Sequence, residues 1–179
     1  MTILDRSIPR LRQLEELFSA SAHTIYSTTE ALEQAVYYAD LVIGAVLVAG
    51  AAAPKLVRRD MLPKMRRNAV VVDVAIDQGG CFETSRPTTH ANPTYKVDNI
   101  LHYCVANMPG AVARTSTLAL SNATLPFVIA LANKGYRQAL LDDAHLANGL
   151  NVHRGDVTYE AVARNLGHTF VDPHNALAA

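Results

Sequence analysis

The sequence has no tryptophan, only two cysteines and little charge. Charged residues make up 18% of its 179 positions, and sixteen basic residues balance sixteen acidic ones. This balance argues against a partner held by bulk electrostatics, such as a nucleic acid or an anionic membrane. Half of the residues are apolar, which excludes an intrinsically disordered chain, because disorder requires low hydrophobicity and high net charge. A neutral, apolar chain favours buried interfaces between subunits or domains.

Several signals of other protein classes are also missing. Cys81 and Cys104 lie far apart without a C-x-x-C pair, so they indicate no disulfide framework or zinc site and suit a reducing compartment. The histidines show no metal-ligand spacing, so we expect no metal. We find no signal-peptide pattern, and the longest apolar run, residues 41–53, is too short to cross a bilayer. We therefore expect a cytoplasmic protein.

Apolar runs alternate with helical periodicity through the first 112 residues. Ser7 and either Thr28 or Thr29 are the expected N-caps of two helices. Repeated strand–helix–strand units predict an α/β fold with a parallel, doubly wound sheet. The expected strands are residues 2–5, 23–27, 41–46, 69–75 and 100–106, and the expected helical segments are 8–18, 28–39 and 56–65.

After Pro109 the pattern becomes helical. We expect a long helix over 113–133, kinked or divided at Pro126 and ended at Gly135. Short helices are expected near 136–142 and 159–166, the second capped by Thr158. The chain should therefore consist of a sheet domain, residues 1–112, and a helical extension, residues 113–179.

The glycine pattern of a dinucleotide-binding sheet is absent. The phosphate loop of such a sheet reads G-x-G-x-x-G, and no two of the nine glycines stand at i and i+2. The sequence thus predicts a partial Rossmann-like sheet that lacks its first strand and Gly-rich loop. Asp5 ends an apolar strand, where it could accept the ribose hydroxyls of a dinucleotide or only end the strand and cap the next helix. Spacing alone leaves both interpretations open.

Ligands of a doubly wound sheet bind beyond the carboxyl ends of its strands. Residues 46–50 form an apolar turn that could contact an adenine or belong to the core. Asp77 precedes two glycines and could serve catalysis or only form a turn. Asn107 could bond a carboxamide or make an Asx turn, and Arg86 could meet a pyrophosphate, a neighbouring subunit or only solvent. The basic stretch at 55–67 is more typical of a solvated face than of a nucleic-acid site.

Longer runs of the sequence resemble the alanine dehydrogenase family, to which pyridine nucleotide transhydrogenases are related. The resemblance covers essentially the whole chain and rests on residues 39–48, 72–80, 86–90, 105–117, 122–126 and 157–163. It implies the carboxyl-terminal half of an enzyme that uses NAD for the reversible oxidative deamination of L-alanine to pyruvate and ammonia. It also implies a homo-oligomer, namely a hexamer, whose helical extension packs on the substrate domain.

The same resemblance implies roles for individual residues. Asp77 matches the active-site aspartate, whose charge would stabilise an amine or iminium cation. Ala130 and Lys134 match positions where some members have metal ligands, so no metal is implied. The residues that match cofactor contacts are Asp5, Arg10, Ser27, Val46, Leu47, Val74, Ala75, Ile76, Arg86, Val105, Ala106, Asn107 and Met108.

The family's substrate domain, catalytic histidine and first nucleotide-binding strand have no counterpart in the sequence. We therefore expect the chain alone to be inactive. Two alternatives remain: the NAD-binding component of a proton-translocating transhydrogenase, and a non-catalytic fragment for oligomerisation or binding. Transhydrogenases usually depart from the form of the segment at 77–80 found here.

Overall fold

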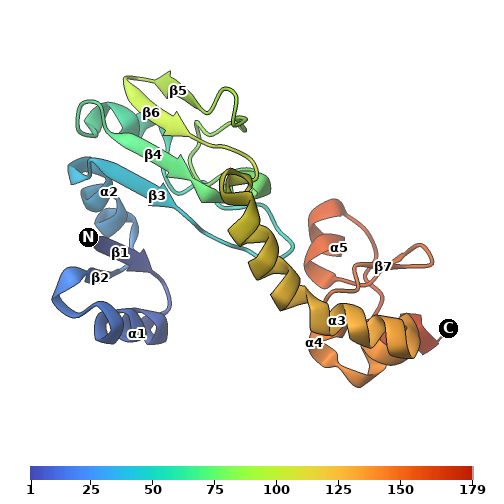
Figure 1. The fold of residues 1–179 in the computed structure, drawn as a ribbon. Coiled ribbons are helices and arrows are strands. Elements are labelled where there is room, and N and C mark those ends of the chain that lie inside the picture. Colours follow the sequence, from blue (N-terminus) through green and yellow to red (C-terminus); the bar gives the residue numbers. More distant parts are fainter. Residues whose placement is uncertain (179) are drawn as a thin grey trace. The chain divides into compact units, whose positions relative to one another are not determined.

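The computed structural model describes residues 1–178, and they divide into two compact units (Figure 1). The first unit comprises Met1–Val46 and Ala53–Ala106. The second comprises Leu47–Ala52 and the residues from Asn107 onward. Each unit has its own strands and helices.

The first unit begins with a small parallel sheet of two strands. Its elements are strand β1 (Thr2–Asp5), helix α1 (Ile8–Phe18), the 3-10 turn η1 (Ser19–Ser21) and strand β2 (His23–Tyr26). The two strands pair with Asp5 opposite Tyr26. The Ser7 hydroxyl accepts the backbone N–H of Arg10 at 3.3 Å and caps α1, which confirms the expected cap.

A second sheet in this unit has four strands in the order β3-β4-β6-β5. These are β3 (Leu41–Gly44), β4 (Val70–Asp73), β5 (Thr94–Val97) and β6 (Ile100–Tyr103). Strands β3, β4 and β6 are parallel, with Gly44 opposite Asp73 and Val72 opposite Tyr103. Their carboxyl ends therefore meet at one edge of the sheet. The partial Rossmann-like α/β architecture predicted from the sequence is confirmed.

Two details of that prediction are wrong. Strand β5 runs antiparallel to β6 and was not expected, because its polar alternation lacks the apolar run of the parallel strands. The parallel strands also end earlier than expected, since β4 stops where residues 74–78 turn into the 3-10 helix η3 (Val74–Gln78). Beyond β6, Val105 forms an isolated bridge to Thr88 instead of extending the strand.

The core of the first unit lies between the four-stranded sheet and its flanking helical segments. Helix α2 (Thr29–Tyr38) is capped by the Thr28 hydroxyl, which accepts the backbone N–H of Ala31, and η2 (Arg59–Lys64) is a 3-10 segment. The largest side chains of the core are fully buried: Val36, Met61, Leu62, Val71, Phe82 and Ile100. Burial of one such side chain contributes about 1.5–3 kcal/mol, so this cluster anchors the segments that lead into and out of β4.

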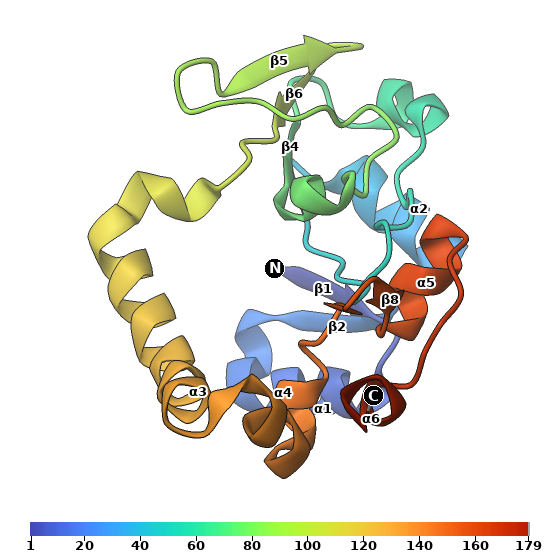
Figure 2. The same cartoon turned by 90° about the vertical axis from the view of Figure 1, so that its right-hand side faces the viewer.

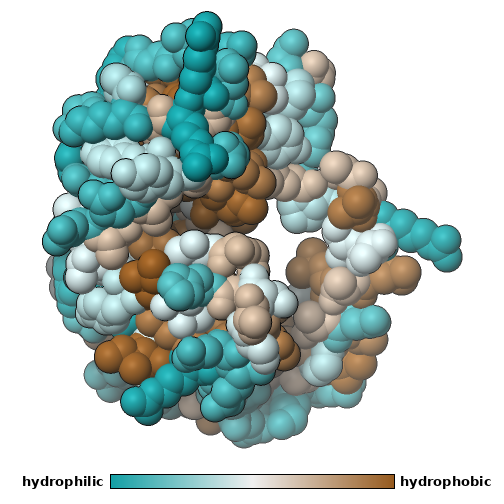
Figure 3. Space-filling view, turned by 90° about the vertical axis from the view of Figure 1, so that its left-hand side faces the viewer, coloured by the Kyte–Doolittle hydropathy of each residue, from teal (hydrophilic) through white to brown (hydrophobic). Residues whose placement is uncertain are grey.

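Strands β1 and β3 each pair along one edge only. Strand β1 pairs with β2, and β3 pairs with β4; no other strand among residues 1–178 pairs with either. Leu41 and Ile43 on β3 are 54% and 60% exposed. Hydrophobic surface, brown in Figure 3, is visible at several places on the face drawn there. Unpaired apolar strand edges favour association with another strand.

The second unit is mainly helical. Its elements are η4 (Met108–Val112), α3 (Ala113–Asp142), α4 (Ala144–Ala147), strands β7 (Val152–His153) and β8 (Asp156–Val157), α5 (Glu160–Leu166) and α6 (Pro173–Ala178). Helix α5 contacts β8, beside which it lies in Figure 2. The loop Leu47–Ala52 also belongs to this unit, and within it Asn165 of α5 donates to the Gly50 carbonyl at 3.0 Å.

The apolar side chains of helix α3 are spread around the helix and do not gather on one face. It continues through Pro126, and its one non-helical residue is Gly135, with φ 72° and ψ 157°. The expected stop at Gly135 is therefore confirmed, whereas Pro126 does not divide the helix. Thr158 does not cap α5 as expected, because its hydroxyl donates to the Leu150 carbonyl at 2.7 Å and the N-cap is Tyr159.

The stretch Met108–Asp142 is long and apolar enough, by length and composition, to cross a membrane. The expectation concerned unbroken apolar runs, and this stretch is not one, because it includes Arg114 and Asn122 and its helix is interrupted at Gly135. Core helices of soluble proteins meet the same criterion, so a single helix of this kind is weak evidence for insertion into a membrane.

Candidate functional site

The carboxyl ends of β3, β4 and β6 bring most of the expected site residues of the first unit to one edge of the sheet. Val46 follows β3, the segment Val74–Asp77 follows β4, and Val105 and Ala106 follow β6. The parallel register of these strands makes the three segments neighbours. This edge is where doubly wound sheets bind their ligands.

Asp77 lies in η3, directly after β4. Ala75 and Ile76 are buried and fix this turn to the core, while Asp77 is exposed. Its carboxylate has no hydrogen-bond or ion-pair partner among residues 1–178. The structure thus presents a carboxylate that is free to meet a cation or a hydrogen-bond donor of a ligand.

Two glycines shape the turn after Asp77. Gly79 and Gly80 have φ values of 88° and 77°, in the left-handed region that favours glycine. A Cβ atom on Gly80 would lie 2.6 Å from Asp73 Oδ2, whereas nothing lies within 4 Å of that position on Gly79. The Lys55 ammonium donates to the carbonyls of both glycines, at 2.8 Å to Gly80, and so holds the end of η3 in place.

Asp73, the last residue of β4, organises the loop that follows these glycines. Its carboxylate is fully buried and accepts the backbone N–H groups of Cys81 at 2.9 Å and Phe82 at 3.3 Å, together with the Ser85 hydroxyl. Burial, followed by the charge of Asp73, raises the pKa of the Cys81 thiol to about 12. The sequence showed an acid inside an apolar strand at this position, but it did not reveal this structural role.

Arg86 follows Ser85 and lies against Tyr95 of β5. The guanidinium carbon is 4.1 Å from the centre of the Tyr95 ring, a cation–π contact. The backbone N–H of Arg86 donates to the Tyr95 hydroxyl at 2.9 Å, and that hydroxyl donates to the Thr84 carbonyl at 2.9 Å. No carboxylate of residues 1–178 pairs with the guanidinium. Sequence reasoning missed Tyr95 because β5 itself was not expected.

His102 of β6 contacts both Tyr95 and Thr84 and so helps to hold the Tyr95 ring in place. Its ring stacks on Tyr95 with 4.9 Å between ring centres, and its Nε2 lies 2.7 Å from the Thr84 hydroxyl. Burial lowers the pKa of His102 below its usual range. With the ring neutral, Nδ1–H donates to the Ile100 carbonyl and Nε2 accepts from Thr84.

A second group of expected residues lies on the two-stranded sheet. Asp5 ends β1, and Ser27 follows β2, with the Ser27 N–H donating to the Asp5 carbonyl at 2.9 Å. One oxygen of the Asp5 carboxylate accepts the Ser7 N–H at 2.7 Å. Arg10 is exposed on α1 and donates to Gln13. The pair of Asp5 and Ser27 is thus brought together at the carboxyl ends of adjacent strands.

Three expected residues belong to the second unit. Leu47 is exposed in the loop Leu47–Ala52. Asn107 has φ 58° and ψ 51° and precedes η4, which begins at Met108.

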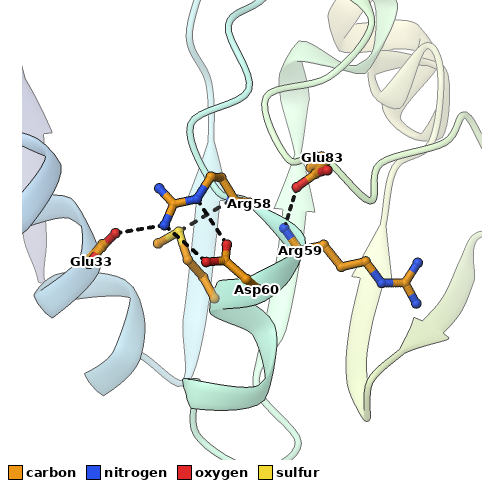
Figure 4. Close-up of polar contacts among 6 residues, drawn as sticks. Glu33, Arg58, Arg59, Asp60 and Glu83 are labelled. Atoms are coloured by element: carbon orange, nitrogen blue, oxygen red, sulfur yellow. Dashed lines mark hydrogen bonds and ion pairs between the residues drawn. The ribbon is translucent and has the colours of Figure 1, made fainter.

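Three basic side chains of the stretch at 55–67, those of Arg58, Arg59 and Arg66, pair with acids, as Figure 4 shows for Arg58. Arg58 bridges Glu33 at 3.1 Å and Asp60 at 3.0 Å, and the backbone N–H of Arg59 donates to Glu83. The hydrogen bond from Arg58 lowers the pKa of Asp60. Residues 1–178 contain no cluster of three or more histidine, cysteine, aspartate or glutamate side chains that could hold a metal ion.

Comparison with known proteins identifies the family of the chain. The family model described as alanine dehydrogenase/PNT, C-terminal domain, matches residues 1–160. The chain belongs to this family. It is 64% identical to an alanine dehydrogenase of Halomonas elongata over 172 residues, which are 96% of this chain and 46% of that protein. It is 53% identical to one of Mycolicibacterium smegmatis over 178 residues, 99% of this chain and 48% of that protein.

Solved structures of the family agree with this assignment. An L-alanine dehydrogenase matches with a TM-score of 0.79 and 48% identity, over 93% of this chain and 46% of that one. A transhydrogenase from Sinorhizobium meliloti matches less well, with a TM-score of 0.62 and 25% identity over 71% of this chain and 36% of that one. The resemblance to the carboxyl-terminal half of the alanine dehydrogenase family is thus confirmed, and the chain spans about half the length of the curated relatives it matches.

Proposed function

We propose that the chain supplies the NAD-binding half of an enzyme for the reversible oxidative deamination of L-alanine to pyruvate and ammonia. The observation that carries the proposal is the exposed, unpaired carboxylate of Asp77 at the end of β4, in a chain 64% identical to an alanine dehydrogenase. Because the chain spans about half of such relatives, the activity is assigned to a complete enzyme, and the chain alone should be inactive.

Asp77 is the catalytic residue in this proposal. A carboxylate at this position would stabilise the positive charge that develops on the substrate nitrogen as hydride leaves the α-carbon. The buried side chains of Ala75 and Ile76 fix the backbone of the turn, so only the Asp77 side chain has to be ordered when substrate binds. When bound, NAD accepts the hydride.

The described residues fit NAD as the cofactor. Asp5 has a carboxylate oxygen without a partner among residues 1–178 and lies beside Ser27, an arrangement suited to the adenosine ribose. The unpaired guanidinium of Arg86 suits a phosphate group. In the proposal, residues 1–112 bind the cofactor and residues 113–179 pack on the substrate domain. The remaining cofactor contacts are Arg10, Val46, Leu47, Val74, Ala75, Ile76, Val105, Ala106, Asn107 and Met108.

The role of Asp77 can be tested in the complete enzyme. Asp77→Asn keeps the shape of the side chain and removes its charge, so kcat for alanine-dependent NADH formation should fall roughly 100-fold. Asp40→Asn is the matched control, because Asp40 is exposed and pairs with Arg66 away from β4's carboxyl end. A kcat for Asp77→Asn equal to that of the control would contradict the proposal.

The complete enzyme is further proposed to be a cytoplasmic homo-oligomer, specifically a hexamer. The support is the neutral composition and the exposed apolar side chains of α3, among them Leu118, Leu120 and Leu125. Light scattering coupled to size exclusion would measure the molar mass of the assembly. A monomer at micromolar concentration would overturn the assignment.

A further inference from the structure

The Arg86 guanidinium has no anionic partner among residues 1–178. Its position is nevertheless defined by an aromatic ring against which it lies. It lies over the Tyr95 ring, and none of the ion pairs among residues 1–178 includes it. Arginine side chains in solvent lose considerable rotamer freedom when they bind an anion. A ring that already holds the guanidinium removes part of that cost before a ligand arrives.

The ring itself is held firmly. Tyr95 stacks on the buried His102, and its hydroxyl joins the backbone of Arg86 to that of Thr84. Burial raises the pKa of the Tyr95 hydroxyl, so the hydroxyl remains a donor at neutral pH. Burial also favours neutral His102, so the group behind the ring does not compete with Arg86 for an anion.

We propose that Tyr95 is a positioning residue, whose ring holds the Arg86 guanidinium as a preformed receptor for the diphosphate of a dinucleotide. The inference rests on the proposed function for the identity of that ligand. It adds a residue outside the expected site, on the antiparallel strand β5. The ring and the hydroxyl of Tyr95 have separable tasks, since the ring contacts the guanidinium and the hydroxyl fixes the loop.

Nuclear magnetic resonance of the purified chain can test the contact directly. The Arg86 Nε–H signal should be shifted upfield by the Tyr95 ring in the wild type and in Tyr95→Phe, and this shift should vanish in Tyr95→Leu. Titration with NAD+, and separately with inorganic pyrophosphate, should move the same signal. An unshifted Arg86 signal in the wild type, or no response to either probe, would overturn the proposal without any variant having to fold.

Binding measurements then separate positioning from a general structural role. Tyr95→Leu should weaken NAD+ binding about two- to fivefold, and Tyr95→Phe should bind like the wild type. In an Arg86→Met background the Tyr95→Leu change should have no further effect. Tyr103→Leu on the neighbouring strand β6 is the matched control. Equal losses in Tyr95→Leu and Tyr95→Phe, or a Tyr95→Leu loss that persists without Arg86, would show that Tyr95 only stabilises the loop.

The two proposals fail differently. If pyrophosphate shifts Arg86 but the complete enzyme does not bind NAD+, the receptor stands and the assignment of NAD as cofactor is wrong. If NAD+ binding depends on Tyr95 as expected but the complete enzyme does not oxidise alanine, the proposed reaction is wrong and the positioning role stands.

Discussion

At the scale of single residues, Gly80 is held more tightly than its neighbour Gly79. Both have positive φ, but only Gly80 lies against the buried carboxylate of Asp73. Gly79→Ala should cost about 1 kcal/mol of unfolding free energy from backbone strain alone. Gly80→Ala should cost about 3 kcal/mol, because strain and a collision combine. Urea unfolding measures both, and equal losses would show that the Asp73 contact does not restrict the turn.

His102 gives the stability of the first unit a dependence on pH. The pKa of His102 is lowered in the folded chain. At pH values between this folded-state pKa and the ordinary pKa of histidine, the unfolded chain therefore binds more protons than the folded chain. Stability therefore rises with pH in this window and is lost as pH falls below about 6.5. His102→Gln should remove this contribution. Urea midpoints of wild type and variant should converge at acidic pH, and a gap that widens there would contradict the assignment.

At the scale of elements, β3 presents apolar side chains that its own sheet does not bury. Leu41 and Ile43 are exposed on one face, whereas Val42 packs against the core. Leu41→Lys with Ile43→Lys should reduce association of the isolated chain with little loss of stability. Val42→Lys is the matched control and should destabilise the chain, because it places a charge beside the core. Sedimentation velocity together with thermal unfolding measures both effects.

The elements that the sequence predicted well are those specified by local chemistry. Ser7 and Thr28 cap helices through hydroxyls three residues from the N–H groups they accept, and Gly135 breaks α3 through its own dihedral angles. Strand β5 was missed because pairing with β6 specifies it, and not an apolar run. Thr158 was assigned wrongly because its hydroxyl bonds Leu150, eight residues earlier in the chain.

The same difference between neighbours in the sequence and contacts formed only on folding applies to the candidate site. Asp77 and the glycines after it were recognised as a unit from their order in the sequence. The contact of Arg86 with Tyr95 was not, since the two lie nine positions apart and Tyr95 belongs to a strand that was not expected. The role of Asp73 was also hidden, because its partners Cys81, Phe82 and Ser85 come together only when the loop folds back.

At the scale of the whole molecule, charge balance and exposed apolar surface act in the same direction. The formal net charge is zero and the isoelectric point is about 7.1, so electrostatic repulsion between copies is weakest near neutral pH. The isolated chain should therefore associate most strongly near pH 7 and less at about pH 9, where its net charge is negative. Dynamic light scattering across this range measures the effect, and a particle size that does not change with pH would contradict it.

The path of the chain between its two units determines how the second unit is encoded in the gene. The boundaries at 46/47, 52/53 and 106/107 mean that the second unit is encoded in two pieces separated by most of the four-stranded sheet. A recombination event that copied only the codons from Asn107 onward would leave behind Gly50, whose carbonyl Asn165 bonds. A chain that began at Asn107 would therefore lack both the loop Leu47–Ala52 and this hydrogen bond, so the second unit depends on two separate parts of the gene.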